Sequence, residues 1–311
     1  MVRVVFMGTP DFAVPSLRAL IATQNVVGVV TQPDRKAGRG RQLRPPAVKV
    51  TAQKAGIPVY QPLSLKEEGA SQPLHDWRPD IIVVAAYGQI LRPHVLELPP
   101  HGCLNIHASL LPRWRGASPI QYAILSGDLE SGVSLMKMDR GMDTGPVYIQ
   151  ISSLIEQNET AATLHDKLAQ IGADLLSNNF EDIVGRRLAA TPQDDALATY
   201  APMIRKSDGA IDWNLTGVQL DRHVRAMTPW PGAVTSWDGK PLKILDAQSI
   251  PPGEIAEKQP GRVSIQNLAV VVASKTGGLR LTTVQLAGKP AMAIDAFVRG
   301  RPDFVGSQLG V

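Results

Sequence analysis

The sequence has 311 residues, of which 44% are hydrophobic and 19% are charged, and its formal net charge is +4. This length and composition are typical of a soluble globular protein with two domains. The single cysteine, Cys103, excludes an internal disulfide framework and a cysteine-based zinc site. No secretory leader and no apolar run of about 18 residues is recognised, so we expect a cytoplasmic protein without a membrane span.

Apolar, β-branched runs alternate with helical patterns through the first half of the chain. Strands are predicted at 2–8, 25–32, 57–62, 80–88, 102–108, 131–139 and 146–155. Helices are predicted within 9–21, 45–56 and 117–127, and a long one over 160–186. This alternation favours an α/β fold with a Rossmann-like, mostly parallel, doubly wound sheet. In such sheets, ligands bind beyond the carboxyl ends of the strands.

The pattern changes near Ser207, where short strands with Gly, Pro, Asp and Lys turns between them replace the longer periodic segments. These strands are predicted at 210–214, 232–237, 242–248, 261–266, 268–274 and 279–286. Repeated short strands indicate a small β-barrel or sandwich. We therefore expect a first domain over 1–188, a linker over 189–206 and a second, β-rich domain over 207–311.

Positive charge is concentrated between Asp34 and Lys49, where six cations accompany one anion. Glycines and a Pro-Pro pair make the first half of this segment a predicted loop. A cationic loop on a nearly neutral chain suits a polyanion such as a phosphate backbone, and the alternative is an ordinary solvated surface loop. The candidate nucleic-acid-binding residues are Arg35, Lys36, Arg39, Arg41 and Arg44.

Several common cofactor motifs do not occur in the sequence. The end of the first predicted strand and the turn after it read MGTPDFA. This segment has one glycine where a dinucleotide fingerprint has three, so NAD binding is not supported. There is also no G-x-x-x-x-G-K-[ST] loop, no G-x-S-x-G elbow and no H-E-x-x-H motif. No spacing typical of metal ligands is found, so no metal is expected.

Asn105 and His107 stand two residues apart at the end of a predicted strand, so they would face the same side. An amide and an imidazole placed together can stabilise an oxyanion that develops on a carbonyl carbon. Neither side chain is a strong nucleophile here, which favours direct transfer between two bound substrates. The alternative interpretation is a hydrogen-bonded polar pair at a strand end.

A carboxylate, Asp143, follows in the glycine-flanked segment MDRGMDTGPVY. From that loop it can reach an imidazole at a neighbouring strand end, and it can orient that ring or hold a water that relays protons. Taken alone, the segment would be an ordinary turn.

Two segments, NIHASLLPRWRGASPI and GVSLMKMDRGMDTGPVY, resemble the signature of the folate-dependent formyltransferases. The resemblance implies that Asn105, His107 and Asp143 form the catalytic trio. It also implies a folate-binding loop at SLLPRWRG, whose candidate residues are Ser109, Leu110, Leu111, Pro112, Arg113 and Gly116.

Three further segments, FMGTPDFAVPSLRAL, VVTQPDRKAGRGRQLRPPAVK and RAMTPWPGAVTSWDGKPLKIL, are similar to the branch of this family that formylates methionyl-tRNA. This similarity implies 10-formyltetrahydrofolate as formyl donor and initiator methionyl-tRNA as acceptor. It further implies that the basic loop contacts the tRNA, that the second domain is an OB-like barrel, and that the protein is a monomer without metal. Three alternatives remain: a formyltransferase acting on an amino-sugar nucleotide, the hydrolase domain of a formylfolate dehydrogenase, and a catalytically silent RNA-binding module.

Overall fold

The computed structural model describes residues 1–37 and 42–310, and its contacts divide the chain into two compact units. The first unit comprises residues 1–119, 130–154 and 165–202, and the second comprises 120–129, 155–164 and the chain from 203 onward. The boundaries predicted around a 189–206 linker stay a prediction. In the structure, this stretch contains the 3-10 turn η3 (Asp195–Leu197) and the short strand β11 (Tyr200–Ala201).

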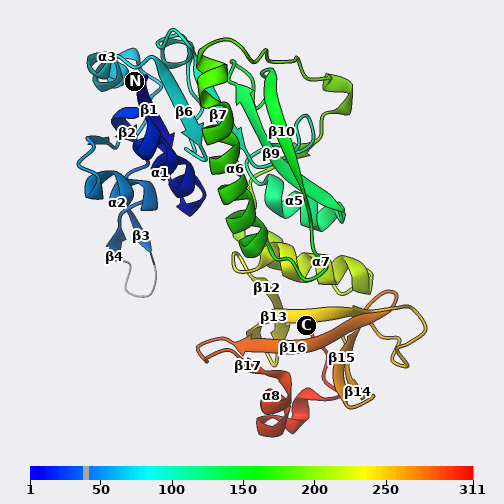
Figure 1. Cartoon of the computed structure of the whole chain (residues 1–311). Coiled ribbons are helices and arrows are strands. Elements are labelled where there is room, and N and C mark those ends of the chain that lie inside the picture. Colours follow the sequence, from blue (N-terminus) through cyan, green and yellow to red (C-terminus); the bar gives the residue numbers. More distant parts are fainter. Residues whose placement is uncertain (38–41, 311) are drawn as a thin grey trace. The chain divides into compact units, whose positions relative to one another are not determined.

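A seven-stranded sheet forms the first unit (Figure 1), in the order β10-β9-β7-β6-β1-β2-β5. Strands β7, β6, β1, β2 and β5 are parallel. Strand β9 pairs antiparallel with both β7 and β10, so β9 alone runs against the other strands. The strands are β1 (Arg3–Gly8), β2 (Asn25–Val30), β5 (Val59–Tyr60), β6 (Ile81–Ala85), β7 (Cys103–His107), β9 (Glu130–Lys137) and β10 (Val147–Leu154). The mostly parallel α/β sheet expected from the sequence is confirmed.

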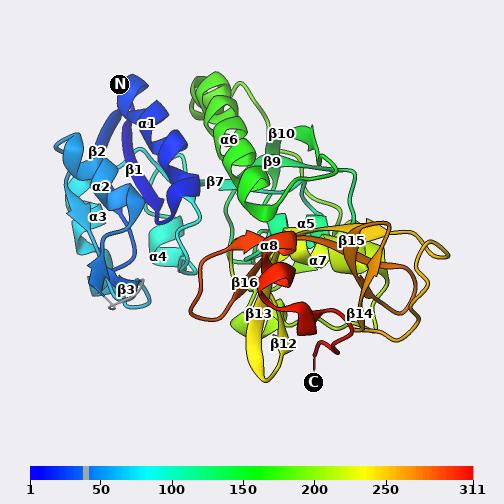
Figure 2. The ribbon, with the colours of Figure 1, turned by 90° about the horizontal axis from the view of Figure 1, so that it is seen from below.

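Helices cover both faces of this sheet, as a doubly wound fold requires. Figure 2 shows α1 and α6 on one side of the strands and α3 and α4 on the other. The helices of this unit are α1 (Val14–Thr23), α2 (Ala47–Lys54), α3 (Gln72–Trp77), α4 (Pro93–Leu96) and most of α6 (Ala161–Val184), with 3-10 turns η1 (Asp11–Ala13) and η2 (Glu68–Ser71). Helix α5 (Pro119–Ser126) belongs to the second unit except for its first residue. The long helix predicted over 160–186 corresponds to α6.

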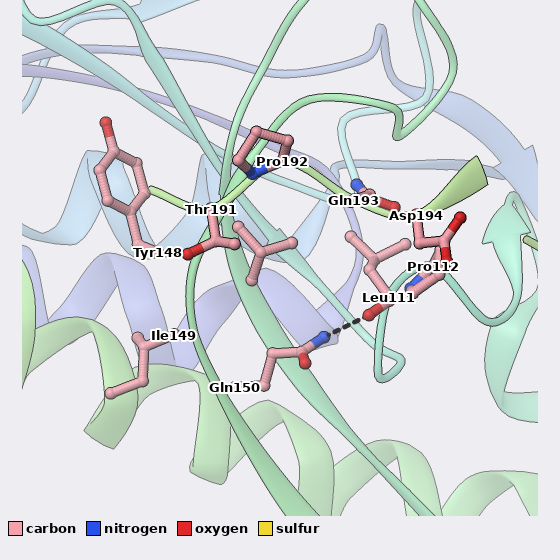
Figure 3. Close-up of a pocket in the computed structure, with 10 residues that line it drawn as sticks. Leu111, Pro112, Tyr148, Ile149, Gln150, Thr191, Pro192, Gln193 and Asp194 are labelled. Carbon is pink, nitrogen blue, oxygen red and sulfur yellow. Dashed lines mark hydrogen bonds between the residues drawn. The ribbon is translucent and has the colours of Figure 1, made fainter. Parts of the chain in front are cut away.

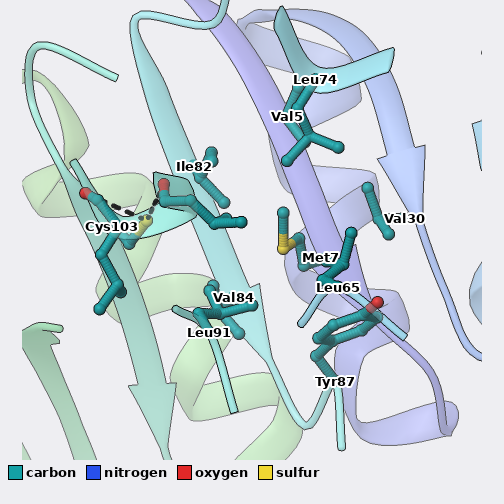
Figure 4. Close-up of a cluster of buried hydrophobic side chains, with 12 residues drawn as sticks. Val5, Met7, Val30, Leu65, Leu74, Ile82, Val84, Tyr87, Leu91 and Cys103 are labelled. Atoms are coloured by element: carbon teal, nitrogen blue, oxygen red, sulfur yellow. Dashed lines mark hydrogen bonds between the residues drawn. The ribbon is translucent and has the colours of Figure 1, made fainter. Parts of the chain in front are cut away.

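The apolar strand residues pack as their alternation predicts. One face of β1, β2, β6 and β7 contributes Val5, Met7, Val30, Ile82, Val84 and Cys103 to a cluster that also contains Leu65, Leu74 and Leu91 (Figure 4). Burial raises the pKa of the Cys103 thiol to about 12. The thiol is therefore protonated at neutral pH and packs as a small apolar group.

The basic segment differs from its prediction as a loop. Its ends pair as a two-stranded hairpin, formed by β3 (Arg35–Ala37) and β4 (Gln42–Arg44), with Arg35 opposite Arg44. Arg39 and Arg41, predicted at the tip, lie outside the described residues.

The second unit contains an antiparallel sheet in the order β12-β13-β16-β15-β14, with β17 paired to β16. The strands are β12 (Ala233–Trp237), β13 (Lys240–Ile250), β14 (Val263–Gln266), β15 (Ala269–Ala273), β16 (Gly278–Leu286) and β17 (Met292–Ala293). The separate β-rich region expected from the sequence is confirmed. Its open strand order is compatible with the partly open barrel of an OB-like fold.

Two helices of the second unit were not predicted, and one predicted strand was wrong. The helices are α7 (Gly217–Met227) and α8 (Ile294–Gly300), and the turns η4 (Lys206–Gly209) and η5 (Pro302–Phe304) accompany them. In place of the strand predicted over 210–214, only Ala210 makes an isolated bridge. The reason lies next to it, because Thr216 and Gln219 form a capping box that starts α7.

Candidate active site

The order of the parallel strands indicates where a ligand binds. Strands β2 and β5 lie on one side of β1, and the next strand of the sheet in the chain, β6, lies on the other side of β1. Ligands bind at such a topological switch point, beyond the carboxyl ends of the strands. Here Thr9 follows β1, and its hydroxyl donates to the carbonyl oxygen of Tyr87 in the loop after β6 (3.0 Å). The side chain of Gln32, after β2, donates to the same carbonyl (3.3 Å).

Asn105 and His107 lie at the carboxyl end of β7, the next strand along this edge. Their exposed fractions are only 8% and 6%, so both are buried polar side chains. The two-residue spacing directs both side chains to the same side of the strand, as the sequence predicts.

Asp143 reaches these two side chains from the loop between β9 and β10. Its Oδ1 accepts a hydrogen bond from Nδ2 of Asn105 (3.3 Å), and its Oδ2 lies 3.7 Å from Nδ1 of His107. The backbone N–H of Gly116 donates to the same Oδ2 (2.9 Å). The structure thus brings together the three groups that the sequence selects from separate segments.

The ring of His107 lies between a backbone carbonyl and a carboxylate. Its Nε2 lies 3.0 Å from the carbonyl oxygen of Trp114, while Nδ1 faces the carboxylate of Asp143 at 3.7 Å, which is longer than a hydrogen bond. Because a carbonyl oxygen only accepts, Nε2 is the donor in the contact with Trp114. Asn105 has a second amide hydrogen, for which the described residues supply no acceptor. This hydrogen is available to a ligand oxygen.

The segment predicted to bind folate is largely fixed to the protein itself. Ser109 and Leu111 are buried, and Ser109 donates to the carbonyl oxygen of Arg113 (2.6 Å). Gln150 donates to the carbonyl oxygen of Leu111 (2.8 Å), as Figure 3 shows. These contacts fix the loop, in which Leu110 and Pro112 are half-buried and Arg113 is exposed. Gly116 contributes its backbone N–H to Asp143.

A cavity of about 300 Å³ adjoins this loop on the β10 side (Figure 3). Leu111 and Pro112 line it together with Tyr148, Gln150 and Gln193. Asn105, His107 and Asp143 do not line this cavity. Gln193 connects the two places, because it lines the cavity and donates to the carbonyl oxygen of Asp143 (2.9 Å).

At the base of the basic hairpin, the charges are partly neutralised. Lys49 pairs with Asp34 (2.8 Å), and Gln61 donates to the same carboxylate. The hydrogen bonds from Gln61 and Lys49 hold the pKa of Asp34 below its ordinary value. Arg35 and Arg44 are both exposed, and Arg35 also donates to the side chain of Gln32 (3.2 Å).

Comparison with known proteins agrees with this geometry. The family model for formyl transferase matches residues 2–179, and the model for the formyl transferase C-terminal domain matches residues 203–302. The chain belongs to the formyl transferase family. Methionyl-tRNA formyltransferases of Magnetococcus marinus and Desulforamulus reducens are each 46% identical to this formyl transferase, over 99% of its chain and 98% of theirs.

Solved structures share the fold at lower identity. An N-formyltransferase from Helicobacter canadensis, in complex with folinic acid and dTDP-3-aminofucose, superimposes with a TM-score of 0.67 at 20% identity. The superposition covers 90% of this formyl transferase and 99% of that chain. At this identity the likeness establishes the fold alone.

The described residues, 1–37 and 42–310, contain neither a cluster of metal ligands nor a membrane-spanning helix. No group of three or more His, Cys, Asp or Glu side chains in this range could hold a metal ion. No helix in the same range has the length and apolar character needed to span a membrane.

Two functional features were not recognised in the sequence. One is the contact of Thr9 and Gln32 with the carbonyl of Tyr87, which only the strand order brings together. The other is Gln193, which lies in the predicted linker and yet contacts the backbone of Asp143. Neither has a local sequence signal, because both depend on contacts between distant segments.

Proposed function

We propose that this formyl transferase transfers the formyl group of 10-formyltetrahydrofolate to the α-amino group of methionine on initiator tRNA. The convergence of Asn105, His107 and Asp143 at the carboxyl end of β7 carries this proposal. The curated relatives named methionyl-tRNA formyltransferase, at 46% identity over nearly the full length, support the choice of acceptor.

The reaction exchanges one C–N bond for another. The neutral amine of methionine attacks the formyl carbon, and the carbonyl oxygen becomes an oxyanion in a tetrahedral intermediate. Asn105 donates to this oxyanion through its second amide hydrogen, and the positive charge of His107 stabilises it further. The bond from the formyl carbon to the folate nitrogen then breaks. The amine loses one proton, and the leaving nitrogen gains one.

Asp143 has two tasks in this scheme. Its carboxylate lies 3.7 Å from Nδ1 of His107, where it faces the ring and orients it. Through a bound water it also relays the proton from the amine to the leaving nitrogen. Removing one oxyanion donor typically costs about 3 kcal/mol, which corresponds to roughly a hundredfold or more in rate.

The two substrates would occupy different parts of the chain. We assign the folate to the crevice beside the loop of Leu110, Pro112 and Arg113, next to the three catalytic residues. The tRNA backbone would contact the basic hairpin through Arg35, Lys36, Arg39, Arg41 and Arg44, and the second unit would add further contacts. Because the acceptor is an aminoacyl-tRNA, we infer that the enzyme acts in the cytoplasm. The family resemblance further implies a monomer.

A formyltransferase acting on an amino-sugar nucleotide is the alternative. It is suggested by the fold shared with the Helicobacter canadensis enzyme, but at 20% identity this likeness is weaker than that to the methionyl-tRNA enzymes.

The deciding experiment measures transfer of labelled formyl from 10-formyltetrahydrofolate to each acceptor by the full chain. We expect rapid formylation of initiator methionyl-tRNA and none of a dTDP-amino sugar, with His107→Ala as the control that loses activity. Formylation of the sugar nucleotide in place of the tRNA would refute the proposal.

A further inference from the structure

The side chain of Gln193 holds the backbone of the Asp143 loop at two points. Its Nε2 donates to the carbonyl oxygen of Asp143 (2.9 Å) and to that of Gly145 (2.7 Å). One amide nitrogen has two hydrogens, so it can make both bonds at once. Asp143 has a φ of +54°, a conformation that a residue with a side chain rarely adopts. The two hydrogen bonds from Gln193 therefore hold the backbone at Asp143 and Gly145, where the positive φ of Asp143 occurs.

The amide of Gln193 can take only one orientation. Its Oε1 accepts a hydrogen bond from Nε of Arg115 (3.0 Å). A guanidinium group only donates and backbone carbonyls only accept, so a flipped amide would lose all three bonds. Arg115 is 2% exposed, and its Nη2 also pairs with Asp195 (2.8 Å). A cation this deeply buried needs such partners, which makes its position well determined.

The two sequence neighbours of Arg115, Trp114 and Gly116, contact the proposed catalytic residues through their backbone. The carbonyl of Trp114 faces Nε2 of His107, and the N–H of Gly116 donates to Asp143. Strand β8 (Arg115–Gly116) pairs with β11, and the N–H of Arg115 donates to the carbonyl oxygen of Thr199 (2.9 Å). The stretch 193–201 is thus joined to the site by both side-chain and backbone hydrogen bonds.

We propose that Gln193 is a positioning residue for Asp143, and that Arg115 sets the orientation of its amide. This inference rests on the proposed formyl transfer. It assigns part of the predicted linker to the active site, although no side chain of that part need touch a substrate. Gln193 should consequently affect the rate of the chemical step more than the binding of either substrate.

Gln193→Glu separates positioning from a general structural role. The variant has nearly the same shape and keeps an acceptor for Arg115, with which it would form an ion pair. It replaces the two donors by an oxygen that faces the carbonyls of Asp143 and Gly145. Repulsion there displaces the loop while the contact with Arg115 is kept.

Kinetics of the full chain provide the first test. For Gln193→Glu we expect kcat to fall on the order of 10- to 100-fold, because small displacements of reacting groups cost this much. KM for the folate and for methionyl-tRNA should stay within about twofold, since a positioning residue acts on the chemical step and not on binding. The matched control is Gln170→Glu on the exposed side of α6, which should retain wild-type kinetics.

Coupling to Asp143 provides the second test. If Gln193 acts through Asp143, then Gln193→Glu should have little further effect in an Asp143→Asn background. An equal loss of kcat in both backgrounds would overturn the inference. So would a Gln193→Glu variant whose kcat lies within about twofold of the wild type.

Hydrogen exchange gives a readout that does not depend on the reaction. Backbone amides of residues 139–146 should exchange faster in Gln193→Glu than in the wild type and in Gln170→Glu. Unchanged exchange would overturn the inference, even if the wild type formylates methionyl-tRNA. Conversely, faster exchange together with a wild type that does not formylate methionyl-tRNA would refute the proposed function and leave the positioning of the loop supported.

Discussion

Gly116 contacts Asp143 through its backbone N–H, and its own conformation requires the absence of a side chain. Its φ is +118°, and a Cβ atom added there would lie 2.7 Å from the carbonyl oxygen of Ala201. Both features permit the close pairing of β8 and β11, which aims the N–H at the carboxylate of Asp143. Gly116 thus contributes to the site through its backbone N–H, in a conformation and space that admit no side chain.

We predict that Gly116→Ala destabilises the first unit by about 2 kcal/mol, through backbone strain and the contact with Ala201. Thermal or urea unfolding measures this loss. Gly69→Ala is the matched control, because Gly69 has no atom within 4 Å of an added Cβ, and it should stay within about 0.5 kcal/mol of the wild type. Equal stabilities of the two variants would contradict the strain argument.

At the scale of single residues, the sequence predicts the three polar groups of the site but not the residues that hold them in place. The spacing of Asn105 and His107 on an apolar strand implies a shared direction, which the structure confirms. Asp143 is selected through the resemblance to the formyltransferase signature, because its glycine-flanked segment alone would be an ordinary turn. Arg115 and Gln193 are not recognisable, because they are 78 positions apart and their bond has no local pattern.

Among the secondary-structure elements, the basic hairpin is the one with a predicted partner outside the chain. Arg44 is exposed on β4. We expect Arg44→Ala to weaken binding of methionyl-tRNA and to lower the slope of log K against log salt by about one, as the loss of one phosphate contact requires. Equilibrium binding over a range of salt concentrations measures both effects.

The control for this prediction is Arg18→Ala, an exposed arginine on α1 that removes the same charge elsewhere. It should leave the salt slope unchanged. If both variants bind the tRNA alike, the hairpin does not contact the phosphate backbone.

Helix α7 contains a histidine that should make the second unit sensitive to pH. Burial lowers the pKa of His223 below its ordinary value of 6.5, and its Nε2 has no hydrogen-bond partner among the described residues. The backbone of Gly209 and the charge of Asp208 oppose this shift but do not outweigh it. The folded state therefore holds the ring in its neutral form.

The linkage follows from this depressed pKa. Above about pH 6.5 the ring is neutral in both states and the unit has its full stability. As the pH falls from there through the folded pKa, the unfolded state takes up a proton first, and stability is lost. We predict that His223→Gln loses less stability than the wild type between pH 8 and pH 5.5 in urea unfolding. The same loss in both proteins would contradict the assignment.

Element types were easier to predict than their limits. The parallel strands and α6 follow from long apolar periodicity, which tertiary contacts reinforce. The helix α7 was missed because short strands dominate its surroundings, although Thr216 and Gln219 form a recognisable capping box. The basic segment reads as a loop from its glycines, but its ends pair as strands β3 and β4.

For the whole molecule, the sequence predicts two kinds of architecture, and the two compact units have them: a mostly parallel α/β sheet and an antiparallel β sheet. Strand order could not be predicted, because it is set by contacts between segments that are far apart in the chain. That order is what places β7 next to β6 and brings the Asp143 loop to the crevice. The arrangement of Asn105, His107 and Asp143 is accordingly a property of the strand order of the first unit.

The central claim is that Asn105, His107 and Asp143 act as one unit in formyl transfer. Single-turnover transfer to initiator methionyl-tRNA by the three single alanine variants and by the triple variant tests it most directly. Each single variant should lose on the order of a hundredfold or more, and the triple variant should be within about tenfold of the slowest single variant. Losses that multiply across the three positions would contradict the claim.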